Sequence, residues 1–374
     1  MRRLRMLLVL AMAASLVACG GGGGPAAGGA RPSGAPASGS APVSGATAAG
    51  SEAPGQPAPA IVEAAAREDP AFELYMSSNF DKDKLAELEQ AFNRRHGLSV
   101  SFRHTPAGSM TRDAARVITE IGAGQPPTWD LMVLTDAHYA TLFTNDALEK
   151  TDWAALGIVN PQSITYDGTA VHFASSFIAP SYNPNLVRAD EAPKDWSDLL
   201  DPKWRGRIGM STATHHLGRL AQVWGDERTT RFVEGLAAQQ LVLGRTAELF
   251  TRLTLGEIAI YATSTDTNWN EAKQTGAPFA FVETVKPVVV ASYTLGVLKG
   301  GKRPNLTRLL AAFMTTPEGQ AIWDASQGQT SMYVEGSSAW RYAQGKELVT
   351  LDPKFGAEQL DDLSQKYGRI VGYR

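Results

Sequence analysis

The feature that most constrains the fold is an alternation of strand-like and helix-like segments that starts at Ala71. Apolar residues recur at every second position in 72–76 and at helical spacing in 85–92, and a strand-like segment followed by a helical one occurs twice more before residue 144. Strands that alternate with helices along a chain form parallel sheets covered by helices. The sequence therefore predicts an α/β fold with a parallel sheet in this region.

Polar residues follow each of these three predicted strands. In parallel sheets, ligands bind outside the carboxyl ends of the strands. Each polar group also precedes a predicted helix, where Ser, Asn and Asp are common helix caps. For any one of these residues, helix capping and ligand binding are equally good explanations. Three polar groups at the same sheet edge, however, favour a binding site. The groups are Ser77, Ser78 and Asn79, then Ser109, then Thr135 and Asp136.

A second region of this kind begins after the apolar residues 173–180. Tyr182 opens a turn, and the short apolar run 208–210 reads as another strand. A strand that ends in small polar residues and opens a helix brings N–H groups and hydroxyls to one point, which suits an anionic or polar ligand. The alternative is an ordinary loop with a threonine helix cap. The polar residues after this strand include Thr212, Thr214 and His215.

Three motifs resemble a known family. Residues 194–208, with the sequence KDWSDLLDPKWRGRI, are similar to the start of the second lobe in substrate-binding proteins of ATP-driven importers, in the branch that includes ferric-iron binders. LGEIA at 255–259 and FMTTPEGQ at 313–320 resemble two further signatures of that branch, and the resemblance covers roughly Ala71 to the C-terminus. It implies a type II periplasmic-binding-protein fold, in which two parallel-sheet α/β lobes are joined by a two-crossover hinge. It also implies a ligand in the cleft between the lobes, and no catalysis.

The apolar runs indicate where the chain would divide. Residues 173–180 and 279–290 read as the two crossovers of the hinge on which closure depends. We therefore expect a first lobe of residues 70–178 and 291–374, and a second lobe of residues 179–290. A strand at 257–262 in the second lobe would end in the polar stretch that contains Asp266 and Trp269.

The composition agrees with a two-lobed α/β chain and gives no support for proteins that bind nucleic acid or polybasic membrane sites. A chain of 374 residues has room for two ordinary domains, and 43% hydrophobic residues are sufficient for packed cores. A formal charge of −3 gives no support for a nucleic-acid or polybasic membrane partner. A single cysteine cannot form an internal disulfide. We expect a monomer without a resident cofactor or metal.

The N-terminus has the features of a bacterial lipoprotein. Three arginines precede the short apolar run 6–14, which suits a secretory signal peptide better than a membrane span. LVACG at 16–20 looks like a lipobox, so residues 1–18 should be removed and Cys19 lipidated, which would anchor the protein in the periplasm or on the cell surface. A simple signal peptide with an incidental cysteine is the alternative. Residues 19–68, rich in Gly, Ala, Pro and Ser, are expected to form a flexible linker.

The resemblance also bears on the solute. Ferric-binding relatives carry two adjacent tyrosines after the Gly-Glu signature, whereas residues 264–269 contain none, which favours an organic or oxyanionic solute over free ferric iron. By position, Thr214 with the N–H groups of His215 and His216 would hold a phosphate, phosphonate or carboxylate. Asp266 would then bind an ammonium group and Trp269 would cover an apolar or cationic portion. The alternatives are exposed helix-start histidines and a tryptophan in the lobe core.

Three functions follow as hypotheses. The first is a lipid-anchored extracytoplasmic protein that captures a small polar or anionic solute and delivers it to an ABC-type permease. The second is a ferric-iron receptor with a different ligand set, for which Tyr182 is the nearest tyrosine donor, ahead of Tyr261 and Tyr293. The third is a secreted enzyme, which the sequence disfavours because it has no GxSxG, no HExxH and no free cysteine for nucleophilic chemistry.

Overall fold

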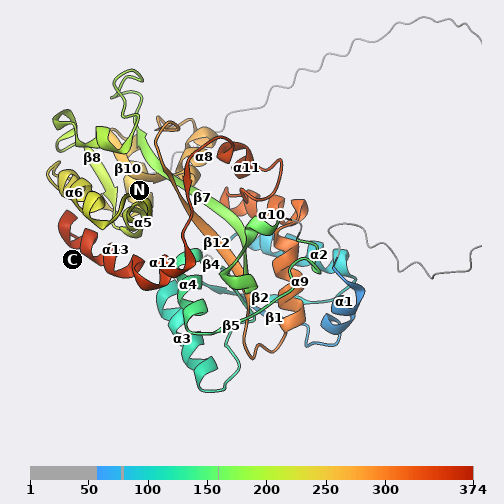
Figure 1. The fold of residues 1–374 in the computed structure, drawn as a ribbon. Helices are drawn as coiled ribbons and strands as arrows, with labels where there is room; N and C mark the ends of the chain where they lie inside the picture. The colour runs from blue at the N-terminus through green and yellow to red at the C-terminus, as the bar shows by residue number, and fades with distance from the viewer. Residues whose placement is uncertain (1–56, 77–79, 159, 374) are drawn as a thin grey trace, which may run out of the picture. The chain divides into compact units, whose positions relative to one another are not determined.

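Parallel strands form the first sheet. The computed structural model describes residues 57–76, 80–158 and 160–373, all of which fall within one compact unit, Glu52–Arg374. Strand β1 (Ala71–Met76) lies between β2 (Ser101–Pro106) and β3 (Leu131–Met132) and pairs in parallel with both. Helices α2 (Lys82–His96) and α3 (Met110–Gly122) connect these strands, as Figure 1 shows. The predicted alternation of strand and helix is confirmed here.

The third predicted strand is divided between two sheets. Within it, β3 pairs with β1, whereas β4 (Leu134–Thr135) pairs with β12 (Val288–Leu298). Between them, Val133 donates its N–H to the carbonyl oxygen of Tyr75. The chain therefore passes from one sheet to the other within a few residues, and this passage places the end of β4 beside β12.

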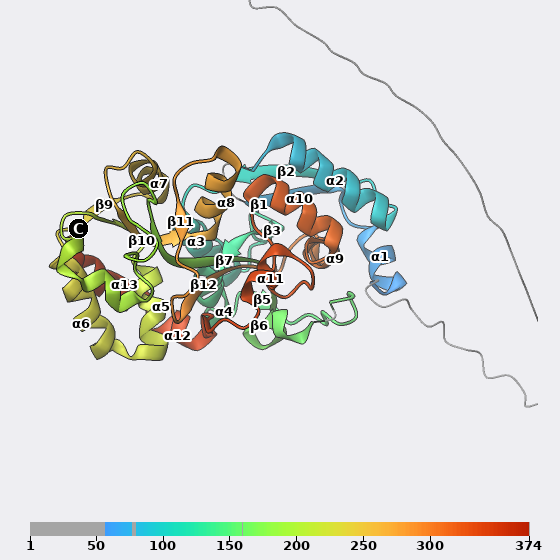
Figure 2. The same cartoon turned by 90° about the horizontal axis from the view of Figure 1, so that it is seen from above.

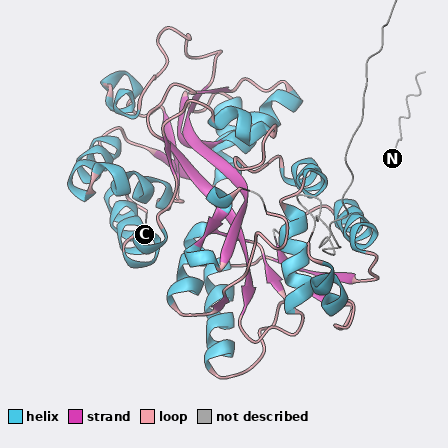
Figure 3. Ribbon diagram, turned by 45° about the vertical axis from the view of Figure 1, so that its right-hand side comes forward, coloured by secondary structure: helices cyan, strands magenta, loops and turns pink. Residues whose placement is uncertain are grey.

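The second sheet is mixed and is built around two long antiparallel strands. Strand β7 (Ala170–Tyr182) pairs with β12 from Ala170 opposite Gly296 to Ile178 opposite Val289. Strand β10 (Ile260–Thr265) adds to β7 in antiparallel fashion, and β8 (Ile208–Ser211) and β9 (Val242–Gly244) follow in parallel. Figure 3 shows β7 and β12 as the longest strands. β7 covers the first predicted crossover, whereas β12 begins at Val288, near the end of the second.

Further helices, short strands and 3-10 turns complete the fold, and each of these short strands pairs with β7 or β12. The helices are α4 (Asp136–Thr144), α5 (His215–Trp224), α6 (Asp226–Ala237), α7 (Thr246–Thr254), α8 (Asp266–Thr275), α9 (Pro304–Met314), α10 (Pro317–Gln327), α11 (Ser338–Ala343), α12 (Pro353–Glu358) and α13 (Leu360–Val371). The short strands are β5 (Leu148–Glu149), β6 (Ile164–Thr165), β11 (Ala280–Phe281) and β13 (Leu348–Val349), and the 3-10 turns are η1 (Pro161–Ser163), η2 (Tyr166–Gly168), η3 (Trp196–Leu200) and η4 (Pro202–Trp204). Within the described ranges, none of the helices is both long and apolar enough to cross a membrane.

Separate apolar cores lie against the two sheets. One core includes Phe92 and Trp323 and packs against β1, β2 and the start of β7. Another includes Trp196, Leu236 and Tyr261 and packs against β8 and β10. Tyr261, one of the lower-ranked tyrosine donors, is therefore a core residue. A third core contains Tyr75 of the first sheet and Leu134 of the second, so the apolar cores cross from one sheet to the other near the start of β7.

The predicted linker ends earlier than residue 68. Residues Pro59–Ala65 form helix α1, which begins with Pro at its first turn and packs against α9. Ala65 is buried in the core next to the first sheet, and the carboxylate of Glu68 accepts N–H groups at the start of α9. The sequence analysis missed this short helix because it lies within a stretch of low-complexity composition. The signal peptide, Cys19, the linker up to residue 56 and Ser77–Asn79 lie outside the described residues.

Two of the family-like signatures are structural. Gly256 in LGEIA has a φ of +80°, a backbone conformation that only glycine adopts without strain, just after the end of α7. Gly319 in FMTTPEGQ lies so close to the backbone of Phe313 and Met314 that a Cβ atom there would collide with it. Both signatures therefore specify how helices meet their neighbours, and neither one identifies a solute.

The C-terminal helices contact elements of both predicted lobes. Helix α12 packs against α4, whereas α13 packs against α5 and α6, as Figures 1 and 2 show. Leu363, Tyr367 and Val371 of α13 belong to the core of the second sheet. The lobe limits stay a prediction, but this packing associates α13 with the second lobe, although residues 291–374 were assigned to the first.

Candidate functional site

Two strand ends of the second sheet lie beside the middle of β7 and β12. The end of β4 pairs with β12 at Thr135 and Tyr293, and the end of β10 pairs with β7 at Thr265 and Ile178. Helices α4 and α8 begin at these two strand ends, with an aspartate as the first residue of each. The paired long strands are thus flanked by two carboxylates, Asp136 beside β12 and Asp266 beside β7.

Asp136 forms a buried ion pair with Arg219 of α5. Its Oδ1 lies 2.5 Å from Nη2 and its Oδ2 lies 2.9 Å from Nη1, so the contact is bidentate. Asp136 is 1% exposed and Arg219 is fully buried. The N–H of Ser292 donates to Asp136 Oδ2, and Arg219 Nη1 also donates to the carbonyl of Val290. The pair therefore links α4, α5 and β12.

The charges of this pair compensate each other, and the imidazoles around it are neutral. Burial by itself raises the pKa of Asp136, but the charge and hydrogen bonds of Arg219 outweigh burial and hold the pKa below its usual value. Burial lowers the pKa of His172 to about 4, and burial together with the charge of Arg219 lowers that of His215 to about 3. Neither histidine carries a charge near neutral pH. This cluster has no net charge to offer an ionic solute.

Polar contacts hold the start of α4 in place. Thr135 Oγ1 lies 2.8 Å from Nδ1 of His138, and the hydroxyl of Tyr166 donates to the carbonyl of Asp136 over 2.5 Å. Tyr166 has a φ of +51°, which is rare for an aromatic residue and marks a strained turn. Thr135 thus contributes to positioning α4 through its contact with His138.

Asp266 differs from Asp136 because no cation compensates it. Its Oδ1 accepts hydrogen bonds from Ser176 Oγ and from the N–H of Phe177, each over 3.0 Å, and no ion pair to it occurs in the described part of the chain. Burial raises the pKa of Asp266 to about 7, although the hydrogen bonds from Phe177 and Ser176 oppose that rise. This side chain is only half-buried, so it is a carboxylate that a solute could approach.

The charges of both carboxylates act on Tyr293 of β12, whose ring also packs against Trp323 with ring centres 6.2 Å apart. Burial raises the pKa of Tyr293 first, and the charges of Asp136 and Asp266 add to that effect. Tyr182, the tyrosine donor favoured from the sequence, instead ends β7 and packs against the core of the second sheet. The sequence analysis considered Tyr293 as a donor but ranked it below Tyr182. No group of three or more His, Cys, Asp or Glu suited to a metal ion occurs among residues 57–76, 80–158 and 160–373.

Four buried hydroxyls in this sheet have no hydrogen bond in the described part of the chain, and all four side chains are at most 1% exposed. They are those of Ser181 in β7, Tyr261 and Thr263 in β10, and Ser292 in β12. Buried hydroxyls in native proteins are normally bonded to protein, water or ligand. The carboxyl end of β10 therefore retains hydrogen-bonding capacity that the protein does not use.

Several predicted site residues have roles that local contacts explain. Ser109 caps α3 by accepting the N–H of Arg112 over 3.4 Å, and the N–H of Thr212 bonds to the carbonyl of Gly244 in β9. The hydroxyl of Thr214 donates to the carbonyl of Ser364 in α13, over 2.7 Å. A contact with α13 thus takes the place of the expected open hydroxyl at the start of α5.

For the two histidines the alternative to ligand binding was an exposed position, and for Trp269 it was a place in the lobe core. His215 and His216 are half-buried with ring centres 4.2 Å apart, so the exposed helix-start interpretation is wrong. Trp269 stacks on Phe281 with ring centres 5.4 Å apart, and the ammonium of Lys273 lies 3.2 Å from its ring centre. These contacts match the alternative of a ring in the lobe core, packed beside Asp266 on the same helix.

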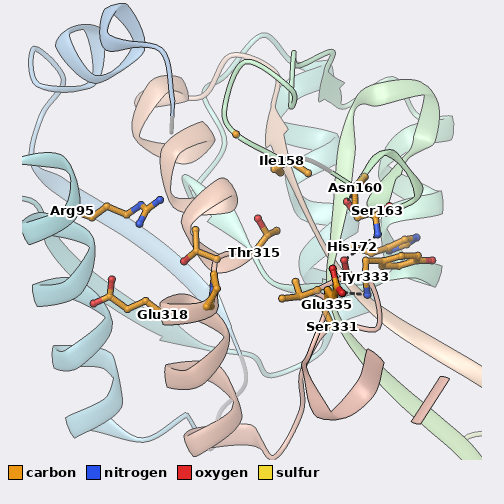
Figure 4. A pocket seen from close by; sticks show the side chains of 14 residues that line it. Arg95, Ile158, Asn160, Ser163, His172, Thr315, Glu318, Ser331, Tyr333 and Glu335 are labelled. Carbon is orange, nitrogen blue, oxygen red and sulfur yellow. Dashed lines mark hydrogen bonds between the residues drawn. The ribbon is translucent and has the colours of Figure 1, made fainter. Parts of the chain in front are cut away.

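A separate cavity of about 770 Å³ opens beside the start of β7, as Figure 4 shows. His172 stacks on Tyr333 in its wall, with ring centres 6.0 Å apart, and His172 Nδ1 lies 2.9 Å from Thr294 Oγ1. This size is typical of small-molecule sites. The lining residues, however, come from the predicted first lobe alone: Arg95, Gly157, Ile158, Asn160, Ser163, His172, Thr315, Thr316, Pro317, Glu318, Ser331, Tyr333, Val334 and Glu335.

Removing the charge of Asp136 should destabilise the protein strongly. Asp136→Asn leaves Arg219 buried without its counter-ion, and we expect the free energy of unfolding to fall by about 3–5 kcal/mol in urea denaturation. The double variant Asp136→Asn/Arg219→Met should recover most of the loss, because no buried charge remains. Asp190→Asn, which breaks an exposed pair with Arg188, should change little. Equal losses in the single and double variants would contradict the ion-pair explanation.

The raised pKa of Asp266 should make stability depend on pH. An ordinary aspartate has a pKa of about 4, so between about pH 4 and pH 7 the folded state retains a proton that the unfolded state has released. That proton stabilises the fold fully below this window, and its contribution is lost as the pH rises through 7. The unfolding free energy of the wild type relative to Asp266→Asn should therefore fall across the window. If the difference in unfolding free energy between the wild type and Asp266→Asn stays constant from pH 4 to pH 8, the raised pKa of Asp266 is refuted.

Sequence comparisons agree with the resemblance. Residues 87–333 match the family of bacterial extracellular solute-binding proteins. An uncharacterized protein of Haemophilus influenzae is 27% identical over 196 residues, which cover 48% of this chain and 56% of that protein. The chain thus spans little more than half the length of this relative.

Solved structures share the fold. Iron-bound HitA from Pseudomonas aeruginosa is 20% identical with a TM-score of 0.66, over 80% of this chain and 99% of that one. A Trichodesmium protein (IdiA, FutA) in complex with iron and citrate is 17% identical with a TM-score of 0.67, over 81% and 100%. The periplasmic binding protein AfuA from Actinobacillus pleuropneumoniae, with fructose-6-phosphate bound, is 17% identical with a TM-score of 0.62, over 81% and 99%.

Sequence identities of 17–20% establish a shared fold and nothing finer. The shared fold extends over nearly the whole length of each solved chain. The family match adds a sequence relation over more than half of this chain. The chain therefore belongs to the bacterial extracellular solute-binding proteins and has the α/β fold of two-lobed periplasmic binding proteins.

Proposed function

We propose that this protein is the solute-binding component of an ABC-type importer and that it captures a small polar solute beside Asp266 and Tyr293. Family membership supports solute binding in place of catalysis. The position of these two residues supports the site, because Asp266 follows the end of β10 beside β7 and Tyr293 lies in β12 opposite the end of β4. Ligands of α/β proteins bind at such strand ends.

The uncompensated carboxylate of Asp266 is the observation that supports this function most directly. A buried carboxylate without a counter-ion is costly. A cationic group of a solute would lower that cost, and the hydroxyls of Ser176 and Tyr293 could add hydrogen bonds. The anion site expected at the start of α5 has weaker support, because Arg219 is already paired and Thr214 bonds to α13. A solute with an ammonium or similar donor group therefore fits better than an anion.

Ferric iron is a second candidate because the charges of two carboxylates act on Tyr293. A hard ferric ion prefers anionic oxygen ligands such as carboxylate and phenolate. HitA and the Trichodesmium protein, both described with iron, share this fold. AfuA, described with fructose-6-phosphate, shares it equally, so the fold does not decide between the solutes.

A thermal-shift screen distinguishes these solutes. Putrescine and choline represent cations, citrate and methylphosphonate anions, and ferric citrate the metal. A solute at 100 times its Kd should add about 2.7 kcal/mol to stability, and we expect the cations to do so in the wild type and in Asp190→Asn but not in Asp266→Asn. Stabilisation by ferric citrate, with a visible absorption band lost in Tyr293→Phe and kept in Tyr182→Phe, would favour iron. No response to any of these solutes would count against the proposed site.

We also propose that Cys19 carries a lipid anchor that holds the protein near its permease. The support is the apolar run and the LVACG motif at 16–20, since these residues lie outside the described part of the chain. A Cys19→Ala variant should move from the membrane fraction to the soluble extracytoplasmic fraction of expressing cells. Retention of that variant in the membrane would argue for another mode of attachment.

A further inference from the structure

The cavity beside the start of β7 is separate from the proposed solute site. Its lining comes mainly from the segment that leads into η1, from the start of α10 and from the loop 331–335, and its volume is about 770 Å³. Figure 4 shows the 14 residues that line it, and neither Asp266 nor Tyr293 is among them. A volume of this size is sufficient for a small molecule. The solute site beside Asp266 therefore does not account for this cavity.

An imidazole with an open nitrogen lies in the wall of the cavity. His172 of β7 is 7% exposed, and its Nδ1 lies 2.9 Å from the hydroxyl oxygen of Thr294. No hydrogen bond reaches its Nε2 in the described part of the chain. Burial lowers the pKa of His172 to about 4, so the ring is neutral at neutral pH. Because buried polar groups are normally paired, Nε2 is an atom with which a ligand can form a hydrogen bond.

Two buried serines add hydrogen-bonding groups without charge. The hydroxyl of Ser163, which is 4% exposed, donates to the carbonyl of Asn160 over 2.7 Å and retains lone pairs that can accept. The hydroxyl of Ser331, which is 1% exposed, accepts the N–H of Tyr333 over 3.2 Å. The proton of that hydroxyl has no acceptor among the described residues. The wall therefore offers an open acceptor and an open donor in addition to the imidazole.

Flat rings form one side of the cavity. Tyr333 stacks on His172 with ring centres 6.0 Å apart and planes inclined by 13°, as Figure 4 shows. Ile158 and Val334 add apolar surface to the lining. Aromatic side chains pack well against other rings in offset arrangements. This side of the cavity therefore suits a flat ring better than an extended chain.

The charged lining residues are less buried than the polar groups described above. Glu318 and Glu335 are exposed and Arg95 is half-buried, whereas the imidazole and the two serines are buried. Glu318 is also paired with Arg94 over 3.2 Å. An ion placed among uncharged buried groups loses its hydration without gaining a counter-charge, which is costly. The buried part of the cavity thus favours an uncharged ligand.

We infer that this cavity is a second binding site, which takes an uncharged flat ring with a hydrogen-bond donor and an acceptor on its edge, such as a heterocyclic amide. The ring packs against Tyr333, and its edge groups bond to His172 and the two serines. This inference goes beyond the proposed solute capture, because it concerns a different class of ligand at a different place. A failed solute screen therefore leaves it intact, and its own failure leaves the solute site intact.

Small probes of similar size test the class of ligand. Nicotinamide and uracil are uncharged, whereas benzoate is an anion and benzylamine a cation. In calorimetric titrations we expect the uncharged probes to bind the wild type at least about tenfold more tightly than the charged ones, because ions lose hydration in a neutral pocket. Asp266→Asn should bind them as the wild type does, since that residue lies outside the cavity. The inference fails if neither uncharged probe binds at millimolar concentration, or if the charged probes bind equally well.

Substitutions in the wall test where nicotinamide binds. Ser331→Ala removes the open donor and should weaken binding about fivefold. Val334→Trp should abolish binding, because the larger side chain fills the cavity. Ser197→Ala replaces an exposed serine of η3 outside the cavity and should leave the affinity unchanged. An affinity that is the same in Ser331→Ala, Val334→Trp and the wild type would contradict this location.

Protection of a cysteine locates the probe without a large substitution. In a Cys19→Ser background, Val334→Cys places a thiol in the wall, and Val223→Cys places one on the exposed surface of α5. Nicotinamide at about ten times its Kd should slow labelling of the Val334→Cys variant by methyl methanethiosulfonate about tenfold, because few sites stay empty. Labelling of the Val223→Cys variant should not change. Equal rates with and without nicotinamide at position 334, or slowing in both variants, would refute binding in this cavity.

Discussion

The ion pair between Asp136 and Arg219 determines how the two halves of the structure fit together. Its partners lie 83 residues apart in the sequence and belong to helices that follow strands of the second sheet. Two buried charges are tolerated only when each satisfies the other in good geometry. The bidentate contact, with added bonds to Ser292 and Val290, therefore selects one placement of α4 against α5 and β12.

The two aspartates that begin α4 and α8 show how surroundings decide the role of a residue. Both follow a strand and both lie beside the paired long strands. Arg219 compensates Asp136, whose pKa falls, while the pKa of Asp266 rises because burial acts on it without a cation. Asp136 thus stabilises the fold, whereas Asp266 is a carboxylate whose charge no protein cation in the described part of the chain compensates and which a cationic solute would favour. This difference is the reason why the proposed site lies on the β7 side of the paired strands.

The motifs that carry the family resemblance belong to the scaffold. Gly256 requires its left-handed backbone, and Gly319 allows α10 to approach the backbone at the end of α9. One fold serves proteins described with iron, with iron and citrate, and with fructose-6-phosphate, so scaffold positions of this kind do not identify the solute. The solute must be inferred from side chains at the strand ends, which these motifs do not include.

The sequence by itself determined the alternation of strands and helices, the first long crossover and the polar residues at the strand ends. These features depend on periodicity and on turn residues, which are local properties of the chain. Helix α1 was missed because seven residues within a low-complexity stretch carry too weak a pattern. Only the tertiary structure decided that Arg219 is buried, that Thr214 bonds to α13, and that the charges of both carboxylates act on Tyr293. Charge compensation and burial depend on distances between segments far apart in sequence, and packing of the two sheets alone sets those distances.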